Sequence, residues 1–193
     1  MKCYKLLPNF SINLPIPEIV EGVVVITGNN GSGKTTLLRL LSDKYDVNDN
    51  EIVEIINKSN LFFELNNLSK DETLANNIQL IKSLCSIDDE LFDMFINVFQ
   101  LKSRLKIKAK KCSAGEIKKL LIALNLSQNM NPIYFLDEPF ENLDLRSKNS
   151  LIEILDKMFN KKNGKTLLVT AHRVFELDSI KSKRIDLGEG KVS

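Results

Sequence analysis

The feature that most constrains this chain is a glycine-rich stretch, GNNGSGKT, at residues 28–35. It follows VVVIT at residues 23–27, an apolar run typical of a strand buried on both faces of a parallel sheet. It precedes a segment from Thr35 to Ser42 with helical character. The pattern G-x-x-x-x-G-K-[ST] is therefore satisfied between a strand and a helix, the context it requires. We expect phosphate groups to bind at the start of this helix.

The loop supplies the groups that a polyphosphate and its metal ion need. Its glycines let the backbone turn N–H groups inward, and the helix N-terminus adds positive potential at the same place. Lys34 can reach the β and γ phosphates, and the Thr35 hydroxyl is placed to ligate Mg²⁺. The alternative is a glycine-rich turn that carries a lysine by chance. We expect contacts to the nucleotide from Gly28, Asn29, Asn30, Gly31, Ser32, Gly33, Lys34, Thr35 and Thr36.

Two adjacent acids follow a second apolar run. IYFL at residues 133–136 is typical of a buried strand, and Asp137 and Glu138 come directly after it. In open α/β sheets ligands bind at the carboxyl edge of the strands, where these acids fall. We expect Asp137 to hold Mg²⁺ through water and Glu138 to polarise the attacking water as a general base. In the alternative, the acids only cap the next helix.

The rest of the pattern predicts an α/β protein with a mostly parallel central sheet. TLLVT at residues 166–170 is a third buried strand, and a helical segment long enough for a crossover precedes each later strand. The segment from Ser150 to Phe159 is predicted to be an amphipathic helix packed on the sheet. Its apolar positions, spaced i, i+3, i+4 and i+7, are Leu151, Ile154, Leu155 and Met158.

Two regions depart from this alternation. Residues 70–111 are helical by period and contain no run typical of a buried strand, which predicts an inserted helical subdomain. Its expected apolar stripe is Leu91, Met94, Phe95, Val98 and Phe99. Near the N-terminus, Pro8, Pro15 and Pro17 separate short extended pieces, as in a small antiparallel β part made of edge strands.

Length and composition favour one cytosolic domain. The chain has 193 residues, and no apolar run approaches the roughly 20 residues that cross a bilayer. The N-terminus lacks the apolar stretch of a secretory signal. The three cysteines, Cys3, Cys85 and Cys112, form no CxxC pair, which argues against a disulfide framework or a zinc site.

Charge gives little support for nucleic acid as a partner, because the formal net charge is only +2. One stretch is locally basic and contains no acid. It is either a solvated ridge or a contact for lipid headgroups or an acidic partner. Its residues are Lys102, Arg104, Lys106, Lys108, Lys110 and Lys111.

Beyond these features, the order of the motifs resembles that of the ATP-binding-cassette ATPases over almost the full length. CSAGE at residues 112–116 is similar to that family's LSGGQ signature, and it departs from the usual pattern at Cys112, Ala114 and Glu116. Ser113 is the expected N-cap of the helix that follows. The resemblance implies that Ser113 and Gly115 contact the γ-phosphate held by an opposite subunit.

Further motifs continue the resemblance. FLDEPFENLD at residues 135–144 is similar to a joined Walker B motif and D-loop, in which Leu143 and Asp144 would face the partner subunit. His172 follows the third strand as the family's switch histidine does, which implies that it contacts the γ-phosphate and orients Glu138. RIDLGEGKV resembles the family's closing strands.

Two family elements match less closely. LSKDETL at residues 68–74 resembles the stretch after the Q-loop, and counting back nine residues from Ser69 gives Asn60 in place of glutamine. Asn60 is either a Mg²⁺ ligand through water or a loop residue. Tyr4 lies 24 residues before Gly28, about where the family stacks an aromatic ring on adenine, with Phe10 as the competitor. Either ring could instead belong to the core.

The resemblance implies a single ABC ATPase domain, 1–193, that binds ATP and Mg²⁺ and dimerises around them as a homodimer or heterodimer. A domain of this length would power a membrane permease carried on a separate chain, from the cytoplasmic side of the cell membrane. The alternatives are a soluble cassette that acts on ribosomes or DNA, a P-loop phosphotransferase, and a nucleotide-binding module with little turnover. The first two predict features that this sequence does not show: tandem cassettes or a long coil for one, and an acceptor site for the other.

Overall fold

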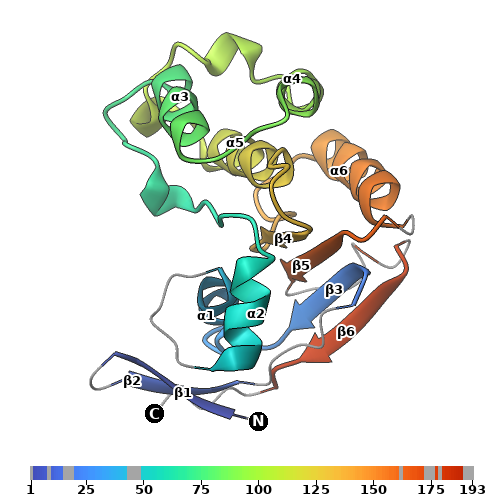
Figure 1. Cartoon of the computed structure of the whole chain (residues 1–193). Helices are drawn as coiled ribbons and strands as arrows, with labels where there is room; N and C mark the ends of the chain where they lie inside the picture. The colour runs from blue at the N-terminus through green and yellow to red at the C-terminus, as the bar shows by residue number, and fades with distance from the viewer. Residues whose placement is uncertain are drawn as a thin grey trace.

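The computed structural model describes residues 2–7, 10–14, 20–42, 49–160, 163–171, 177 and 180–188, and in the first two ranges only the backbone. Its centre is a parallel sheet of β3 (Gly22–Thr27), β4 (Ile133–Leu136), β5 (Thr166–Thr170) and β6 (Ser182–Asp186). The strand order is β4-β5-β3-β6 (Figure 1). The parallel sheet and the α/β class predicted from the sequence are confirmed.

The register of the sheet brings the ends of three strands to one edge. Leu136 of β4 pairs with Val169 of β5, and Thr170 of β5 pairs with Ile26 of β3. Because the strands are parallel, the residues that follow β3 and β4 emerge at the same edge. The phosphate loop and the two acids are therefore neighbours although about a hundred residues separate them in the sequence.

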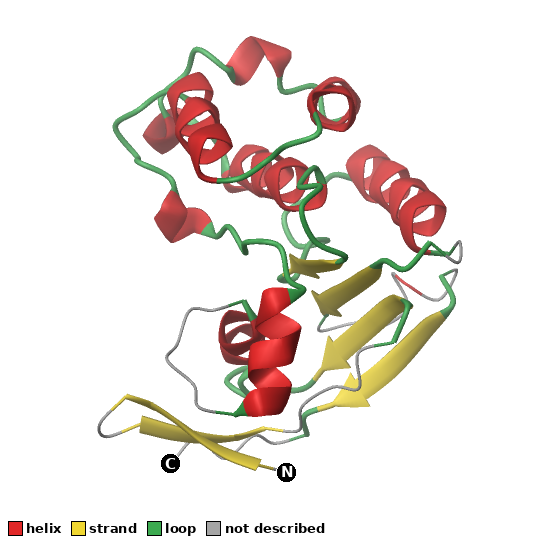
Figure 2. Cartoon of the chain, viewed as in Figure 1, coloured by secondary structure: helices red, strands yellow, loops and turns green. Residues whose placement is uncertain are grey.

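Helices cover both faces of the sheet, as Figure 2 shows. Alternate strand residues point to opposite faces, so each face has its own core. On one face α1 (Lys34–Leu41) and α2 (Asn50–Asn57) pack on Val24, Ile26, Phe135 and Leu168. On the other face α5 (Ala114–Leu126) and α6 (Leu145–Phe159) pack on Val23, Val25, Tyr134, Leu136, Leu167 and Val169.

The region between α2 and α5 is helical in part only. It holds α3 (Leu74–Leu84) and α4 (Asp89–Val98), with short 3-10 turns at Leu65–Asn67, Lys102–Arg104 and Ala109–Lys111. Within residues 70–111, where the sequence predicts a helical subdomain, turns and 3-10 segments connect and follow α3 and α4. α4 ends at Val98, and Gln100 just after it has a left-handed φ of 57°, which an α-helix cannot accommodate.

The predicted stripe of α4 is confirmed except at Met94, since Phe95 and Phe99 are buried and Leu91 and Val98 pack against the core. The buried positions are Phe92, Phe95, Ile96 and Phe99, which are also spaced i, i+3, i+4 and i+7, whereas Met94 is 36% exposed. Apolar residues surround most of this helix, so two adjacent stripes fit the same sequence. Packing against α5 selects between them.

The structure also gives the start of α6 and the pairing of the N-terminal strands. The helix predicted from Ser150 begins at Leu145, because Asp144 caps it by accepting a hydrogen bond from the Ser147 N–H at 2.9 Å. Its first turn is polar apart from Leu145, which is 74% exposed, and so carries no apolar period. At the N-terminus, β1 (Lys2–Leu7) and β2 (Phe10–Leu14) pair antiparallel, as predicted.

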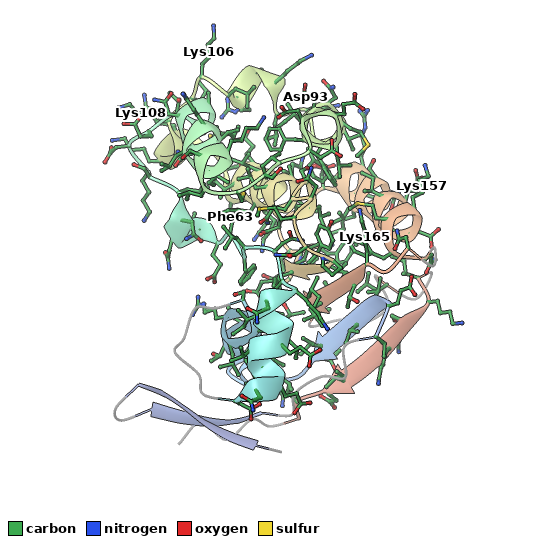
Figure 3. All side chains as sticks on the ribbon, viewed as in Figure 1. Phe63, Asp93, Lys106, Lys108, Lys157 and Lys165 are labelled. Carbon is green, nitrogen blue, oxygen red and sulfur yellow. The ribbon has the colours of Figure 1, made fainter. Side chains whose placement is uncertain are left out.

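The basic stretch is partly neutralised. Arg104 forms an ion pair with Glu116 at 2.7 Å, and Lys110 forms one with Asp71 at 2.6 Å. The side chains of Lys106 and Lys108 point away from the body of the molecule (Figure 3). Among the described helices, none has the length and apolar character needed to span a bilayer.

Candidate functional site

The phosphate loop wraps around the side chain of Lys34. Its ammonium group donates hydrogen bonds to the carbonyl oxygens of Gly28 at 2.9 Å and Asn29 at 3.1 Å. The side chain is only 5% exposed, and its Nζ lies 3.9 Å from Glu138 Oε1. The charge is therefore held inside the loop, with a carboxylate beside it.

The backbone of the loop is open to an anion. Gly33 is the N-cap of α1 with a φ of 94°, and no side chain caps the first turn. The N–H groups at the start of α1 thus lack the partner that a Ser or Asp cap would give. Gly28 is required for a different reason, since a Cβ there would lie 2.5 Å from Ser32 Oγ.

The side chain of Ser32 also fits a binding site for a polyphosphate. Its Oγ is buried and has no hydrogen-bond partner among the described residues. A buried hydroxyl without a partner is unfavourable by about 1–3 kcal/mol, so such atoms usually face a ligand or a bound water. Uncapped N–H groups, a buried lysine and this hydroxyl together fit the phosphates of a nucleotide.

The two acids after β4 sit against this loop. Thr35 Oγ1 donates to Asp137 Oδ2 at 2.9 Å, which ties the first turn of α1 to the end of β4. Asp137 Oδ1 accepts a second hydrogen bond from Thr170 Oγ1 at 2.6 Å. A hydroxyl and a carboxylate side by side at the phosphate loop form a donor set that suits Mg²⁺.

Glu138 has an unusual backbone. Its φ is 44°, in the left-handed region that residues with a Cβ rarely occupy, and its N–H donates to Thr170 Oγ1 at 2.8 Å. Its side chain is about one-fifth exposed and points toward Lys34. The carboxylate is therefore partly open to solvent at the edge of the loop.

The signature stretch begins α5 with a reciprocal cap. Ser113 Oγ accepts from the Glu116 N–H at 3.2 Å, and Glu116 Oε2 accepts from the Ser113 N–H at 2.8 Å. The predicted N-cap at Ser113 is confirmed. Burial raises the pKa of Glu116, but the hydrogen bond from Ser113 and the ion pair with Arg104 outweigh it and leave this pKa below its usual value.

Gly115 lies against the loop that follows the two acids. A Cβ at this position would be 2.5 Å from the backbone oxygen of Asn142, which itself has a left-handed φ of 60°. Two lysines of α5 reach the same loop, Lys118 Nζ to the Asp137 carbonyl oxygen at 3.0 Å and Lys119 Nζ to Asp144 Oδ2 at 2.6 Å. The start of α5 and residues 137–144 are thus packed as one unit.

The structure does not bring all the predicted residues together. Among the described residues, no hydrogen bond or ion pair joins Ser113 or Gly115 to residues 28–36 of the same chain.

The structure favours the second interpretation of Asn60, that of a structural loop residue, over that of a metal ligand. Its side chain is 3% exposed and bonded at the start of β4, not at the end where Asp137 lies. Its Nδ2 donates to the carbonyl oxygens of Asn131 at 2.7 Å and Ile133 at 3.1 Å, and its Oδ1 accepts from the Asn131 N–H at 3.1 Å. All its bonding groups are used in holding the chain together.

Three predictions cannot be placed. His172 lies outside the described residues. Tyr4 and Phe10 lie in β1 and β2, of which the structure describes only the backbone. Their roles stay predictions.

Side-chain amides that the sequence analysis did not single out fix the segment beside β4. Asn125 Oδ1 accepts from the Phe63 N–H at 2.8 Å, and its Nδ2 donates to the Phe63 carbonyl at 2.9 Å. Gln128 bonds the N–H and carbonyl of Leu61 in the same way, at 2.9 and 2.7 Å. Both amides come from α5 or the turn after it, so that end of α5 is fastened to residues 61–63.

This segment borders a groove of about 570 Å³. Apolar side chains from both walls line it, including Phe63, Leu65, Ile117 and Leu121, and Asp137 lies in its lining. Figure 3 shows Phe63 where the helical part meets the sheet part. Glu64, also in the lining, is held by Arg39 of α1 at 2.8 Å. The groove thus runs from the surface to the Asp137 end of β4.

Comparison with known proteins agrees with this geometry. The family model described as ABC transporter matches residues 17–141, which is more than half of the chain. The lipoprotein-releasing system ATP-binding protein LolD of Leptospira interrogans is 31% identical over 208 residues, which cover 91% of this chain and 84% of LolD. The cytochrome c biogenesis ATP-binding export protein CcmA of Vibrio vulnificus is 29% identical, with 89% of each chain covered.

Solved structures give the same result for the fold. The dimeric structure of MJ0796, a bacterial ABC transporter cassette, superposes with a TM-score of 0.72 at 25% identity and covers all of this chain and 93% of that one. ABC cassettes dimerise and work with transporter permeases. The chain therefore belongs to the ABC transporter ATP-binding family, as a cassette that binds ATP, hydrolyses it to ADP and phosphate, and energises transport.

Proposed function

We propose that ATP binds with Mg²⁺ at residues 28–36 and that Glu138 activates the water that attacks it. The observation that carries this assignment is the hydrogen bond between Thr35 and Asp137, which joins the phosphate loop to the acidic end of β4. In this arrangement Thr35 and Asp137 hold the metal ion, whose charge stabilises the phosphate oxygens during transfer.

Each residue then has a defined task. Lys34 exchanges its bonds to two loop carbonyl oxygens for bonds to phosphate. Because the ammonium group is already buried in the loop, no charge has to be taken out of water at this step. Glu138, already 3.9 Å from Lys34, accepts a hydrogen bond from the attacking water. We further propose that His172, two residues after Thr170 in the sequence, contacts the γ-phosphate.

Two cassettes complete the sites by exchange. We propose that Ser113 and Gly115 of one chain contact the nucleotide held by its partner, in a homodimer or a heterodimer. Support comes from the likeness to a dimeric cassette. Hydrolysis removes the phosphate that joins the two chains, so the dimer opens after each turnover.

The transport partner is proposed to be a membrane permease on a separate chain. LolD and CcmA are named as the ATP-binding components of a releasing system and an export system, respectively. Here the groove lined by Phe63, Leu65, Ile117 and Leu121 is apolar and large enough for one turn of an amphipathic helix of such a permease. We propose one ATPase domain, 1–193, with residues 70–111 as its helical subdomain, at the cytoplasmic face of the cell membrane.

Two substitutions test the assignment. Lys34→Ala is expected to abolish ATP binding, and Glu138→Gln is expected to keep binding but lower turnover by about 10²- to 10⁴-fold, the range for a general base. Glu138→Gln should also accumulate as an ATP-bound dimer in size-exclusion chromatography. Glu153→Gln on the exposed side of α6 is the control for loss of one carboxylate. Hydrolysis by Glu138→Gln at the parent rate would show that Glu138 is not the base.

A further inference from the structure

We propose that Thr170 is a positioning residue for ATP hydrolysis, and that its hydroxyl holds Asp137 and Glu138 in working geometry. The proposal rests on the roles assigned above to these two acids. It adds a residue from β5 to the site. Among the described residues, the Thr170 side chain bonds only to Asp137 and Glu138.

One hydroxyl makes both contacts. Thr170 Oγ1 donates to Asp137 Oδ1 at 2.6 Å and accepts from the Glu138 N–H at 2.8 Å. The side chain is fully buried, so water does not compete for either bond. The hydroxyl therefore donates to one acid and accepts from the other at the same time.

The register of the sheet explains why this residue is in place. Leu136 pairs with Val169 in the parallel ladder, so the residue after Val169 lies beside the residue after Leu136. Thr170 is the last residue of β5, and Asp137 is the first residue beyond β4. A β-branched side chain has few χ1 states, so the hydroxyl is presented in a fixed direction.

Each acid needs this support for its own reason. The Asp137 carboxylate is held on one side by Thr35, whose hydroxyl is also the group that would turn to a metal ion, and on the other by Thr170. Glu138 has a φ of 44°, which is unfavourable for a residue with a Cβ. A hydrogen bond from its N–H to a rigid acceptor favours this conformation over extended ones, and with it the direction of the side chain.

A second threonine on the same strand separates positioning from packing. Thr166, at the opposite end of β5, is also buried, and its hydroxyl donates to the Val20 carbonyl oxygen at 3.0 Å. Replacing either threonine by valine keeps the branched shape and removes one buried hydroxyl. Only the change at position 170 touches the acids.

The experiment measures steady-state ATP hydrolysis by the full chain in Mg²⁺ for Thr170→Val, Thr170→Ser and Thr166→Val. Thr170→Val is expected to lower kcat by about 10- to 100-fold, the range for residues that orient catalytic groups, with KM for ATP nearly unchanged. Thr170→Ser keeps the hydroxyl and should recover most of kcat. Thr166→Val should hydrolyse ATP at the parent rate.

Three results would overturn the proposal: a parent-like kcat in Thr170→Val, an equal loss in Thr166→Val, or a rise in KM alone. If Thr170→Val does not fold, as judged by circular dichroism, Thr170→Cys replaces it, because a thiol is a weak donor and acceptor. A parent-like kcat in that variant overturns the proposal as well. Glu138→Gln, measured alongside, separates the two hypotheses. Loss of turnover there with full turnover in Thr170→Val rejects only the role of Thr170, whereas full turnover in Glu138→Gln rejects the base.

Discussion

Replacing Asn125 by leucine tests how strongly the end of α5 is fastened to the segment beside β4. The Asn125 side chain is 3% exposed, and both of its bonds to the Phe63 backbone are buried. Leucine has the same branching at Cγ and is larger than asparagine, so the substitution removes the two hydrogen bonds without opening a cavity. The N–H and the carbonyl of Phe63 are then left in an apolar environment.

The expected effect follows from those two groups. Each buried backbone group without a partner is unfavourable by about 1–3 kcal/mol, which gives roughly 2–6 kcal/mol for the pair. Replacing an amide by an apolar side chain returns roughly 1–2 kcal/mol of desolvation. The free energy of unfolding should therefore fall by about 2.5 kcal/mol at the middle of these two ranges, a large part of the 5–15 kcal/mol typical of a domain.

Gln128→Leu is the matched comparison. Gln128 makes the same pair of bonds to Leu61, but that residue is 43% exposed and its bonds are only partly buried. Water can replace the lost amide there, so the loss should stay below about 1.5 kcal/mol. Urea unfolding followed by circular dichroism measures both. A loss under 1 kcal/mol in Asn125→Leu, or equal losses in the two variants, would refute this account of the amides.

Two more predictions concern the contact between α5 and the loop after β4. Gly115→Ala should lower both kcat and the melting temperature. Its methyl group must move about 0.9 Å from the Asn142 oxygen to reach ordinary contact, and overpacking of this kind costs about 1–3 kcal/mol. Hydrolysis and melting curves like the parent's would show that the loop adapts freely. Lys119 and the hydrogen bonds of Ser147 hold the pKa of Asp144 well below its usual range. A lowered folded-state pKa stabilises the fold above the unfolded value of about 3.9, and this contribution is lost as pH falls through the folded value. Asp144→Asn keeps the cap but removes the charge, so its melting temperature should lie below the parent's at pH 7 and approach it below about pH 4, whereas a constant gap would argue against the ion pair.

Much of the central sheet could be predicted from the sequence, because β3, β4 and β5 are buried on both faces and read as continuous apolar runs. β6 could not be predicted from its own residues, since three of its five are exposed. The stripe of α4 could be predicted except at Met94, because apolar residues on adjacent positions fit two overlapping periods. Local pattern finds an element, and tertiary packing decides which of its faces is buried.

The functional site, too, could be predicted from the sequence only in part. The contact between Thr35 and Asp137 could be expected, because a loop pattern and a strand end both point to the same edge of the sheet. Thr170 could not be singled out, since only the register of β4 against β5 shows which residue lies opposite Asp137. The two interpretations of Asn60 could not be separated, because a count from a neighbouring motif fixes distance along the chain and not which end of a strand a residue reaches.

The amides of Asn125 and Gln128 also affect how this protein behaves in crowded solution. The segment at residues 61–63 offers backbone N–H and carbonyl groups that, if unpaired, could recruit a strand from another molecule. Side chains of the same chain already occupy them. A strand of another molecule can therefore pair with these backbone groups only by displacing the two amides.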